Sequence, residues 1–261
     1  RVCRIASGNS MTGFTDHGIK HGSISNINKW IEAPDAWVSH YLFGHRGSGS
    51  SAMWRGIFTE QAVSDTITEK LKIDDALDKA AKDFDAKVMF DDDGSAAKER
   101  LNIEPMTRLA VEALEPYGKP DFPKDGEQHK VSMRATGDGW ELDFIGFIDF
   151  KFPDHGLIVD LKTTGRMPST MSKGHQRQRA FYAKASGNAT VKFLYVTPKK
   201  VAMLEDGDPD ELMAEIKLHL TRQEAFLRLG DKELLKSIVP VNPDSFYWRG
   251  DEALRKQLYG I

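Results

Sequence analysis

The stretch GFIDFKFPDHGLIVDLKTT, from Gly146 to Thr164, decides the fold of the chain around it. Two segments rich in aromatic and β-branched residues flank a PDHG turn, which predicts a pair of antiparallel strands. If the turn is symmetric, Phe152 pairs with Leu157, and Asp149 then lies opposite Asp160. These two acids are unexpected in a hairpin that otherwise has the composition of a protein core.

Side chains alternate along a strand, so Asp160 and Lys162 share one face of the hairpin while Val159 and Leu161 share the other. Opposed carboxylates on neighbouring strands repel each other, and a divalent cation removes that repulsion. Oxygen ligands suit Mg²⁺ or Mn²⁺. The pattern therefore predicts either a metal site at Asp149 and Asp160 or a hydrated polar face on which Lys162 pairs with one acid.

The rest of the chain alternates between helical patterns and short apolar strands, with residues 1–22 read as an irregular arm. Residues 23–261 read as a single domain with helical additions at both ends. The order of elements predicts an α/β fold of the α+β kind, with a central mixed sheet and a strand meander flanked by helices. We expect helices over 26–43 (capped by Ser25 and interrupted near Pro34), 52–70, 74–90, 95–116, 171–186, 209–229 and 250–258, and strands over 129–136, 140–152, 156–164, 191–197 and 199–205.

The composition is that of a folded globular protein, with 40% hydrophobic and 29% charged residues among 261. The net charge of −3 gives no indication of a nucleic-acid partner. Cys3 is the single cysteine, which excludes an internal disulfide and a cysteine-held metal. We expect a reducing, intracellular and cytoplasmic setting, and no membrane partner because the sequence has no apolar run of spanning length.

Asp149 followed by Asp160-Leu161-Lys162 at the end of an apolar strand resembles the active-site motif of the PD-(D/E)xK nuclease superfamily. Gln178-x-x-x-Tyr182 in HQRQRAFYAKA (175–185) resembles an element of its RecB-like branch. As an alternative, the same spacing occurs in any amphipathic helix with a half-buried tyrosine.

Two further segments lie in the order found in RecB-like nucleases. MWRGIFTEQAV (53–63) resembles the R-G-x-x-x-(H/E) helix of that branch. Its Glu60 stands where many members have His, which is closer to phage-type recombination exonucleases of the lambda exonuclease and YqaJ kind. SISNINKWIEAPDAWVSHYL (23–42) resembles the opening segment of the branch, with Pro34 followed by Trp37.

The resemblance implies a restriction-endonuclease-like core and hydrolysis of phosphodiester bonds dependent on Mg²⁺ or Mn²⁺. It implies that Glu60, Asp149, Asp160 and the backbone carbonyl of Leu161 hold the metal. Lys162 would lie beside the scissile phosphate. Gln178 and Tyr182 would position the nucleophile or the strand.

DNA contact requires local positive charge. The segment 163–179, which follows Asp160-Leu161-Lys162, supplies most of it, and Arg55 precedes Glu60 on its predicted helix. The alternative is that these residues form an ordinary charged surface. The candidate DNA-binding residues are Arg55, Thr163, Arg166, Lys173, His175, Arg177 and Arg179.

The leading hypothesis is a DNA exonuclease of phage recombination or DNA processing that acts on linear duplex ends or single strands. An endonuclease of the same superfamily, a non-catalytic DNA-binding module and a metal-dependent hydrolase of another fold remain alternatives. A recombinase and a single-strand binding protein are candidate protein partners between which the sequence does not choose. The lambda-type relatives also include ring-shaped trimers.

Overall fold

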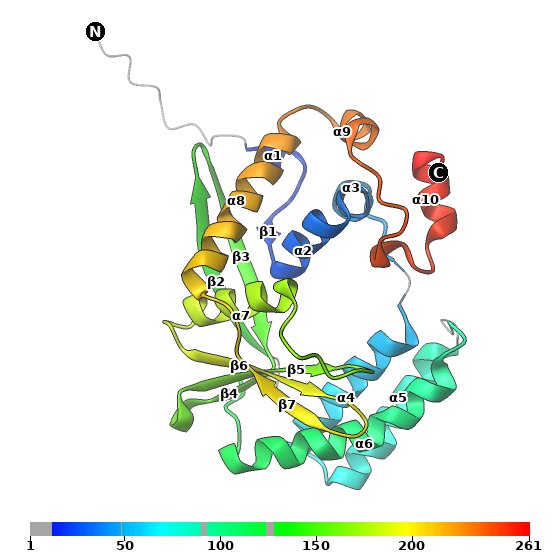
Figure 1. Ribbon diagram of the computed structural model, residues 1–261, viewed down its shortest axis with the longest axis vertical. Helices are drawn as coiled ribbons and strands as arrows, with labels where there is room; N and C mark the ends of the chain where they lie inside the picture. The colour runs from blue at the N-terminus through cyan, green and yellow to red at the C-terminus, as the bar shows by residue number, and fades with distance from the viewer. Residues whose placement is uncertain (1–11, 48, 90–92, 124–127) are drawn as a thin grey trace. The chain divides into compact units, whose positions relative to one another are not determined.

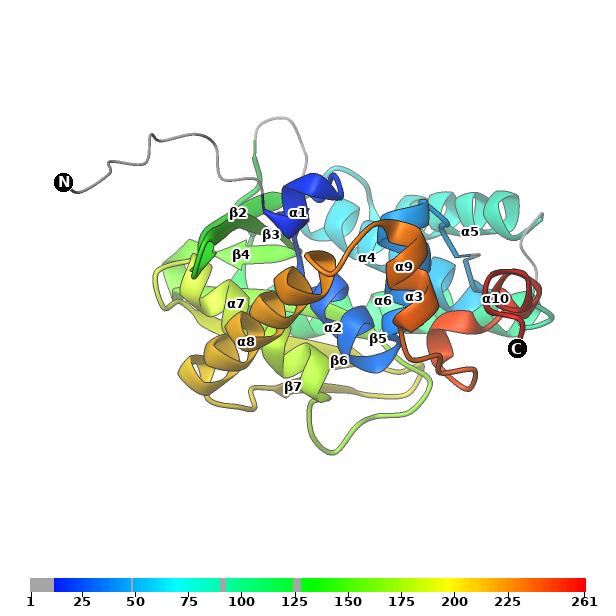
Figure 2. The same ribbon diagram turned by 90° about the horizontal axis from the view of Figure 1, so that it is seen from above.

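The computed structural model describes residues 12–47, 49–89, 93–123 and 128–261, and it shows a mixed α/β chain (Figures 1 and 2). Its strands form a three-stranded sheet with the order β1-β3-β2 and a four-stranded sheet with the order β4-β5-β6-β7. The predicted α+β class, with mixed sheets flanked by helices, is confirmed. The strands are divided between two sheets rather than gathered in one central sheet.

The elements follow the order expected from the sequence, with small additions at the start and near the end. The helices are α1 (Gly13–Asp16), α2 (Ile24–Glu32), α3 (Pro34–Phe43), α4 (Ser51–Ile67), α5 (Ile73–Val88), α6 (Ala96–Leu114), α7 (Lys173–Ala185), α8 (Pro209–Leu227), α9 (Lys232–Ile238) and α10 (Glu252–Tyr259), with short 3-10 turns η1 (Glu115–Tyr117), η2 (Pro153–His155) and η3 (Phe246–Trp248). The strands are β1 (His21–Gly22), β2 (His129–Gly137), β3 (Trp140–Ile148), β4 (Phe150–Phe152), β5 (Leu157–Thr163), β6 (Thr190–Val196) and β7 (Val201–Leu204).

The chain divides into two compact units, each assembled from separate stretches. The first unit contains residues 1–47, 132–146 and 211–261, and the second contains residues 48–131 and 147–210. The assignment of 23–261 to a single domain stays a prediction, because compact units of this size occur both as parts of one domain and as separate domains.

The hairpin of β4 and β5 organises the four-stranded sheet of the second unit. Its register pairs Phe150 with Val159 and Phe152 with Leu157, which is the register predicted from the PDHG turn. Gly156 ends that turn with a φ of 56°, a left-handed conformation that glycine adopts at low cost. Asp149 lies at a bend between β3 and β4, at the point where the hairpin begins.

Strand β5 is central: it runs antiparallel to β4 and parallel to β6, and β6 pairs antiparallel with β7. Val159 and Leu161 pack into an apolar cluster with Val63 of α4 and Met106 of α6. Asp160 alternates with them and therefore faces the other side of the sheet, where it contacts Gln178 of α7. The predicted division of β5 into an apolar face and a charged face is confirmed.

Helices α4, α5 and α6 lie beside one another in Figure 1 and share a second apolar cluster. Alanines contribute several of its buried positions, which allows the helix backbones to approach closely. Phe84 of α5 and Ile103 of α6 fill the space between them. This packing holds α4, the helix that carries Glu60, against α5 and α6 within the second unit.

The described part of the predicted N-terminal arm is ordered, which corrects the expectation of an irregular lead-in over its residues 12–22. The backbone N–H groups of Gly13 and Phe14 donate to the two carboxylate oxygens of Glu224, at 2.8 and 3.1 Å. Phe14 packs edge-on against Trp140. Residues 1–11 lie outside the described part of the chain.

The C-terminal segment, for which the sequence offers no motif, packs within the first unit. The indole Nε1 of Trp248 donates to Oδ2 of Asp35 at 2.7 Å, and the hydroxyl of Tyr259 donates to the Asp35 carbonyl at 2.8 Å. At the start of α2, the capping residue is Ser23 rather than the expected Ser25, because the helix begins at Ile24.

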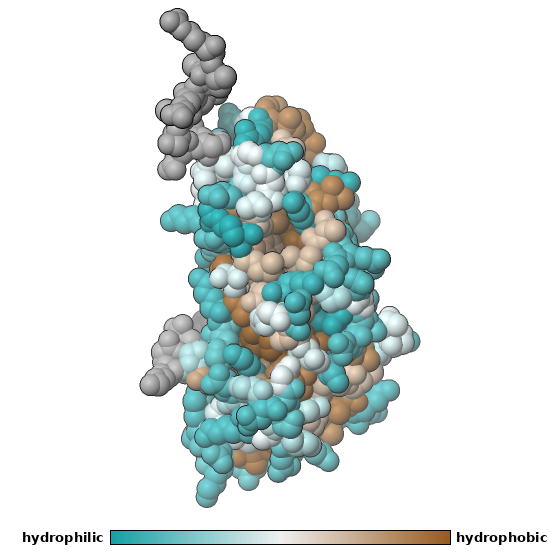
Figure 3. Space-filling model, turned by 90° about the vertical axis from the view of Figure 1, so that its left-hand side faces the viewer, coloured by the Kyte–Doolittle hydropathy of each residue, from teal (hydrophilic) through white to brown (hydrophobic). Residues whose placement is uncertain are grey.

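Within the described residues, every helix is too short or too polar to cross a membrane. On the face drawn in Figure 3, hydrophilic and hydrophobic residues are intermingled.

Candidate active site

Six side chains that the sequence singled out as catalytic line one pocket of the second unit, with a volume of about 580 Å³. They come from α4, from the bend before β4, from β5 and from α7, so the fold brings together residues that are far apart in the sequence. The six are Glu60, Asp149, Asp160, Lys162, Gln178 and Tyr182.

Arg55 and Gly56 hold α4 against the end of β5. The buried Arg55 guanidinium forms an ion pair with Glu99 of α6, and its Nη2 donates to Thr163 Oγ1 at 3.2 Å. A Cβ atom on Gly56 would lie 3.1 Å from the same Thr163 oxygen, so glycine permits the close approach. Glu60 follows on α4 and lines the pocket. Arg55 therefore holds α4 to α6 and β5, and its expected contact with DNA stays a prediction.

Asp149 is fixed through both carboxylate oxygens. Its Oδ2 accepts from the backbone N–H of Leu161 at 2.9 Å, and its Oδ1 accepts from Gln128 Nε2 at 2.9 Å. The first bond ties the bend before β4 to β5 and places Asp149 beside Asp160. Leu161 thus contributes its N–H to the site, and metal ligation by its carbonyl stays a prediction.

Asp160 is almost fully buried, with 1% of its surface exposed. Its Oδ2 lies 2.5 Å from Lys162 Nζ, and its Oδ1 accepts from Gln178 Nε2 at 3.0 Å. The Lys162 ammonium also lies 5.3 Å from the centre of the Phe193 ring. A quarter of the Lys162 side chain remains exposed, so its positive charge reaches the pocket.

Gln178 and Tyr182 act together, as their spacing of four on one helix face predicts. The Gln178 amide nitrogen donates to Tyr182 Oη at 2.9 Å as well as to Asp160. The Tyr182 hydroxyl in turn donates to the Phe147 carbonyl at 2.5 Å. The Tyr182 proton is used in that bond, and the Gln178 amide, which contacts both Tyr182 and Asp160, holds the Asp160 carboxylate in one orientation.

Gln128, which no motif in the sequence marks, is a further member of the site. Its Nε2 donates to Glu60 Oε1 at 2.7 Å and to Asp149 Oδ1 at 2.9 Å. Gln128 immediately precedes β2, and a polar residue before a strand is too common to indicate a function. Only the tertiary structure identifies it.

Burial raises the pKa values of all three acids, and repulsion from neighbouring acids adds to the effect for Glu60 and Asp149. Burial, then the charge of Asp160, raise the pKa of Glu60 to about 7. Burial, Asp160 and Glu60 raise the pKa of Asp149 well above its usual value. Burial raises the pKa of Asp160 too, although Lys162 opposes that change. One lysine cannot balance three ionised carboxylates, so the pocket favours either protonation of an acid or an additional cation.

Lys162 stays protonated in this setting. Burial acts to lower the pKa of its ammonium, but the charges of Asp160 and Asp149 outweigh burial and raise the pKa above its ordinary value. A lysine that holds its proton so firmly stabilises negative charge and does not act as a base.

The donor chemistry of the pocket fits a hard divalent cation, because the acids offer oxygen alone. Within the described residues, no three His, Cys, Asp or Glu side chains stand in a ready-made arrangement for a metal ion. In this arrangement the Gln128 amide bonds to Glu60 and Asp149, and Lys162 pairs with Asp160. A cation would take over carboxylate oxygens that these donors now hold.

The expected DNA-binding residues separate into exposed and buried groups. Arg166 and Lys173 are exposed, and Thr163 is half-buried. Arg177 and Arg179 are each only 6% exposed. Arg179 donates to the backbone carbonyls of the segment 206–207 at 3.0 and 2.5 Å. Burial corrects the expectation that these two arginines contact DNA from the surface.

His175 contributes no positive charge near neutral pH. Its Nδ1 lies 2.6 Å from Tyr195 Oη, and its ring packs against Phe193. Burial and the charge of Lys162 lower its pKa to about 4. With that pKa His175 is neutral at physiological pH, and its expected contact with DNA stays a prediction for the neutral ring.

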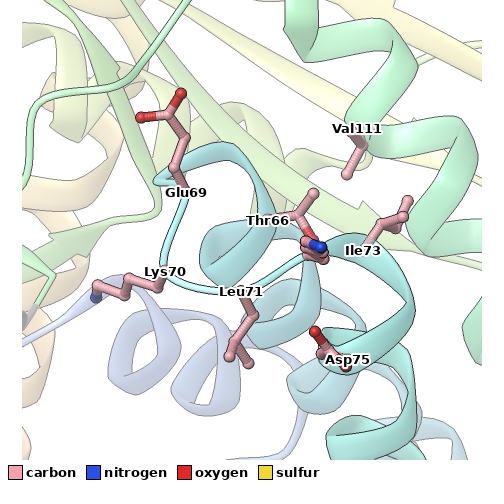
Figure 4. Close-up of a pocket in the computed structure, with 8 residues that line it drawn as sticks. Thr66, Glu69, Lys70, Leu71, Ile73, Asp75 and Val111 are labelled. Carbon is pink, nitrogen blue, oxygen red and sulfur yellow. The ribbon is translucent and has the colours of Figure 1, made fainter.

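The rim of the pocket carries a cation that the sequence did not single out. Lys70, in the turn between α4 and α5, lines the pocket, and its Nζ lies 5.7 Å from the centre of the Phe122 ring. Lys70 also lines a neighbouring pocket of about 640 Å³ (Figure 4), where its side chain points away from Ile73 and Val111.

The chain was compared with known proteins. No family model matches it, and no curated protein does. The crystal structure of SSO0001 is similar with a TM-score of 0.34 and 13% sequence identity, covering 67% of this chain and 77% of that chain. A TM-score of this size carries no argument about family or function.

Proposed function

We propose that the protein is a metal-dependent deoxyribonuclease of the PD-(D/E)xK superfamily, on its RecB-like or phage-type branch, and that it acts intracellularly as an exonuclease. One observation carries the proposal: Glu60, Asp149, Asp160 and Lys162 line one pocket of the second unit. They occur along the chain in the order that the motifs predict. Gln178 and Tyr182, from the helix after the motif strand, orient Asp160 from its other side.

Glu60, Asp149 and Asp160 would hold Mg²⁺ or Mn²⁺. When bound, the cation activates a water molecule and neutralises negative charge on the phosphate. The water oxygen forms a bond to phosphorus as the bond to the leaving sugar oxygen breaks. The proton ends on the leaving oxygen, which leaves a phosphate monoester and a hydroxyl.

The protein's own residues supply orientation and charge for this reaction. Lys162 remains protonated and presents its ammonium to the pocket, where it stabilises negative charge that develops on phosphate oxygens. Gln178 and Tyr182 keep Asp160 in one orientation. On the rim, the exposed Lys70 offers a contact for a neighbouring phosphate of the same strand.

The test compares end-labelled linear DNA with closed-circular duplex DNA, in Mg²⁺ and in EDTA, for the wild type and Lys162→Ala. Lys184→Ala is the matched control, since Lys184 also pairs with an aspartate, at 2.7 Å, and is also 25% exposed, but lies outside the pocket. We expect Mg²⁺-dependent loss of linear DNA alone, abolished in Lys162→Ala and retained in Lys184→Ala.

Cutting of the circle would indicate an endonuclease of the same superfamily. Binding of DNA without cleavage in either Mg²⁺ or Mn²⁺ would overturn the enzymatic proposal and favour a non-catalytic DNA-binding module.

A further inference from the structure

Gln128 uses one amide nitrogen to bond to two acids from different elements. Nε2 donates to Glu60 on α4 at 2.7 Å and to Asp149 before β4 at 2.9 Å. A side-chain amide nitrogen carries two hydrogens, so these two bonds use its full donor capacity. The amide therefore lies between two carboxylates that would otherwise face each other.

This position matters because the two acids repel each other when both are ionised. A neutral amide reduces the cost of holding them together, since each of its N–H groups points its positive end at a carboxylate oxygen. It does so without adding charge. A cation shared by Glu60 and Asp149 would remove the same repulsion more completely, and it would need carboxylate oxygens that now accept from Gln128.

We propose that Gln128 is an internal competitor for the cation: it holds Glu60 and Asp149 together in the metal-free protein and gives up at least one bond when a cation binds. The inference rests on the proposed function, in that the cation is taken to bind at these acids. Gln128 is thus a positioning residue whose side chain sets the affinity of the site for metal.

The competition has a thermodynamic consequence that a purely structural role lacks. Loss of the amide removes two hydrogen bonds to carboxylates from the metal-free form. The metal-bound form loses less, because the cation then supplies the compensating charge. Removal of the Gln128 amide therefore destabilises the metal-free protein more than the metal-bound protein. By linkage, it makes binding of the cation more favourable.

The experiment replaces Gln128 by Met, which has a side chain of similar length without donors. The Gln128→Met variant and the wild type are titrated with Mg²⁺ alone by calorimetry, without DNA. Thermal unfolding is followed in EDTA and in Mg²⁺. Gln61→Met is the matched control, because Gln61 lines the same pocket on α4 but is not the residue that bridges the acids.

We expect Gln128→Met to bind Mg²⁺ about tenfold more tightly than the wild type. Its unfolding temperature should fall in EDTA and recover in Mg²⁺, and Gln61→Met should change neither property. Gln128→Asn, which keeps the amide on a shorter side chain, should change both in the same direction as Gln128→Met. It serves as the second variant if Gln128→Met does not fold in EDTA.

Unchanged affinity in a folded variant would overturn the inference, and weaker affinity would overturn it as well by showing that Gln128 assists the cation. Failure of the wild type to bind either Mg²⁺ or Mn²⁺ would be a separate result, since it would overturn the proposed function itself.

Discussion

Lys162 and Asp160 form an ion pair along a single strand: Nζ of Lys162 lies 2.5 Å from Oδ2 of Asp160, two positions earlier on the charged face of β5. The lysine is thereby held beside the acids and is not free to extend into solvent. The same contact that stabilises Asp160 also places a permanent positive charge in the pocket.

Lys162→Ala should therefore affect both stability and chemistry. Asp160 is 1% exposed and would lose its ionic partner, so we expect the free energy of unfolding in EDTA to fall by about 1–3 kcal/mol. DNA cleavage should fall on the order of 100-fold or more, since charge stabilisation in the transition state is lost. Urea unfolding and single-turnover cleavage measure the two effects, and full activity in the folded variant would contradict the role given to Lys162.

Neutralising the two bridged acids should have opposite effects on stability. In Glu60→Gln, the retained carbonyl oxygen can still accept from Gln128, and one buried charge disappears. We expect the free energy of unfolding in EDTA at pH 8 to rise by about 1 kcal/mol. In Asp149→Asn, the new amide group faces a donor, because the two Asp149 oxygens accept from Gln128 and from the Leu161 N–H.

We therefore expect Asp149→Asn to lower stability by about 1–3 kcal/mol. Both variants should lose Mg²⁺ binding. Urea unfolding in EDTA, with calorimetric Mg²⁺ titrations alongside, tests the pair. Equal loss of stability in both variants would show that the charge of Glu60 does not lower the free energy of unfolding.

The metal-free protein should lose stability as the pH rises through the weakly acidic range. Burial and Asp160 raise the pKa of Glu60 from 4.5 to about 7, so the folded state binds the proton more tightly than the unfolded state. Stability is then greatest below about pH 4.5 for this group and is lost as the pH rises to about 7. The raised pKa of Asp149 acts in the same direction.

Mg²⁺ should reverse this dependence, because the cation favours the ionised acids. Unfolding temperatures measured from pH 5 to pH 8, in EDTA and in Mg²⁺, test the expectation. A metal-free unfolding temperature that is flat across this range in the wild type, and equal to that of Glu60→Gln, would contradict it.

The hairpin could be predicted because its information is local. The PDHG turn and the alternation along 157–163 fix the register and the charged face, and both agree with the structure. The spacing of Gln178 and Tyr182 likewise fixes their shared helix face. Each of these features depends on residues that are close together in the sequence.

The contacts of Gln128 and the burial of Arg177 and Arg179 could not be predicted in this way. The contacts of Gln128 join residues separated by 68 and 21 positions. Arg179 resembles an ordinary surface arginine in the sequence, yet its guanidinium satisfies backbone carbonyls after β7. Whether a charged residue faces solvent or a buried acceptor depends on tertiary packing, which composition and periodicity do not report.

His175 should make the protein sensitive to acid. Burial and Lys162 lower its pKa from 6.5 to about 4, so the unfolded state binds the proton more tightly. This contribution to stability is present above about pH 6.5 and is lost as the pH falls through about 4. His175→Gln should flatten that part of the stability curve relative to the wild type, while the opposite trend from the acids remains. An NMR titration that gives His175 an ordinary pKa would contradict the assignment.

Arg55 provides the sharpest choice between a structural and a DNA-binding role. Its guanidinium bonds to Glu99 and Thr163 at once, and the single ammonium of lysine cannot reproduce that planar arrangement. Arg55→Lys should therefore lower the free energy of unfolding by about 1–3 kcal/mol and weaken Mg²⁺ binding, because α4 no longer holds Glu60 in place. Arg166→Lys, at an exposed arginine, is the control and should leave both unchanged. If Arg55→Lys instead kept its stability and its Mg²⁺ affinity but lost affinity for a 5′-phosphorylated DNA end, the guanidinium would be a phosphate contact and its burial against Glu99 would be incidental.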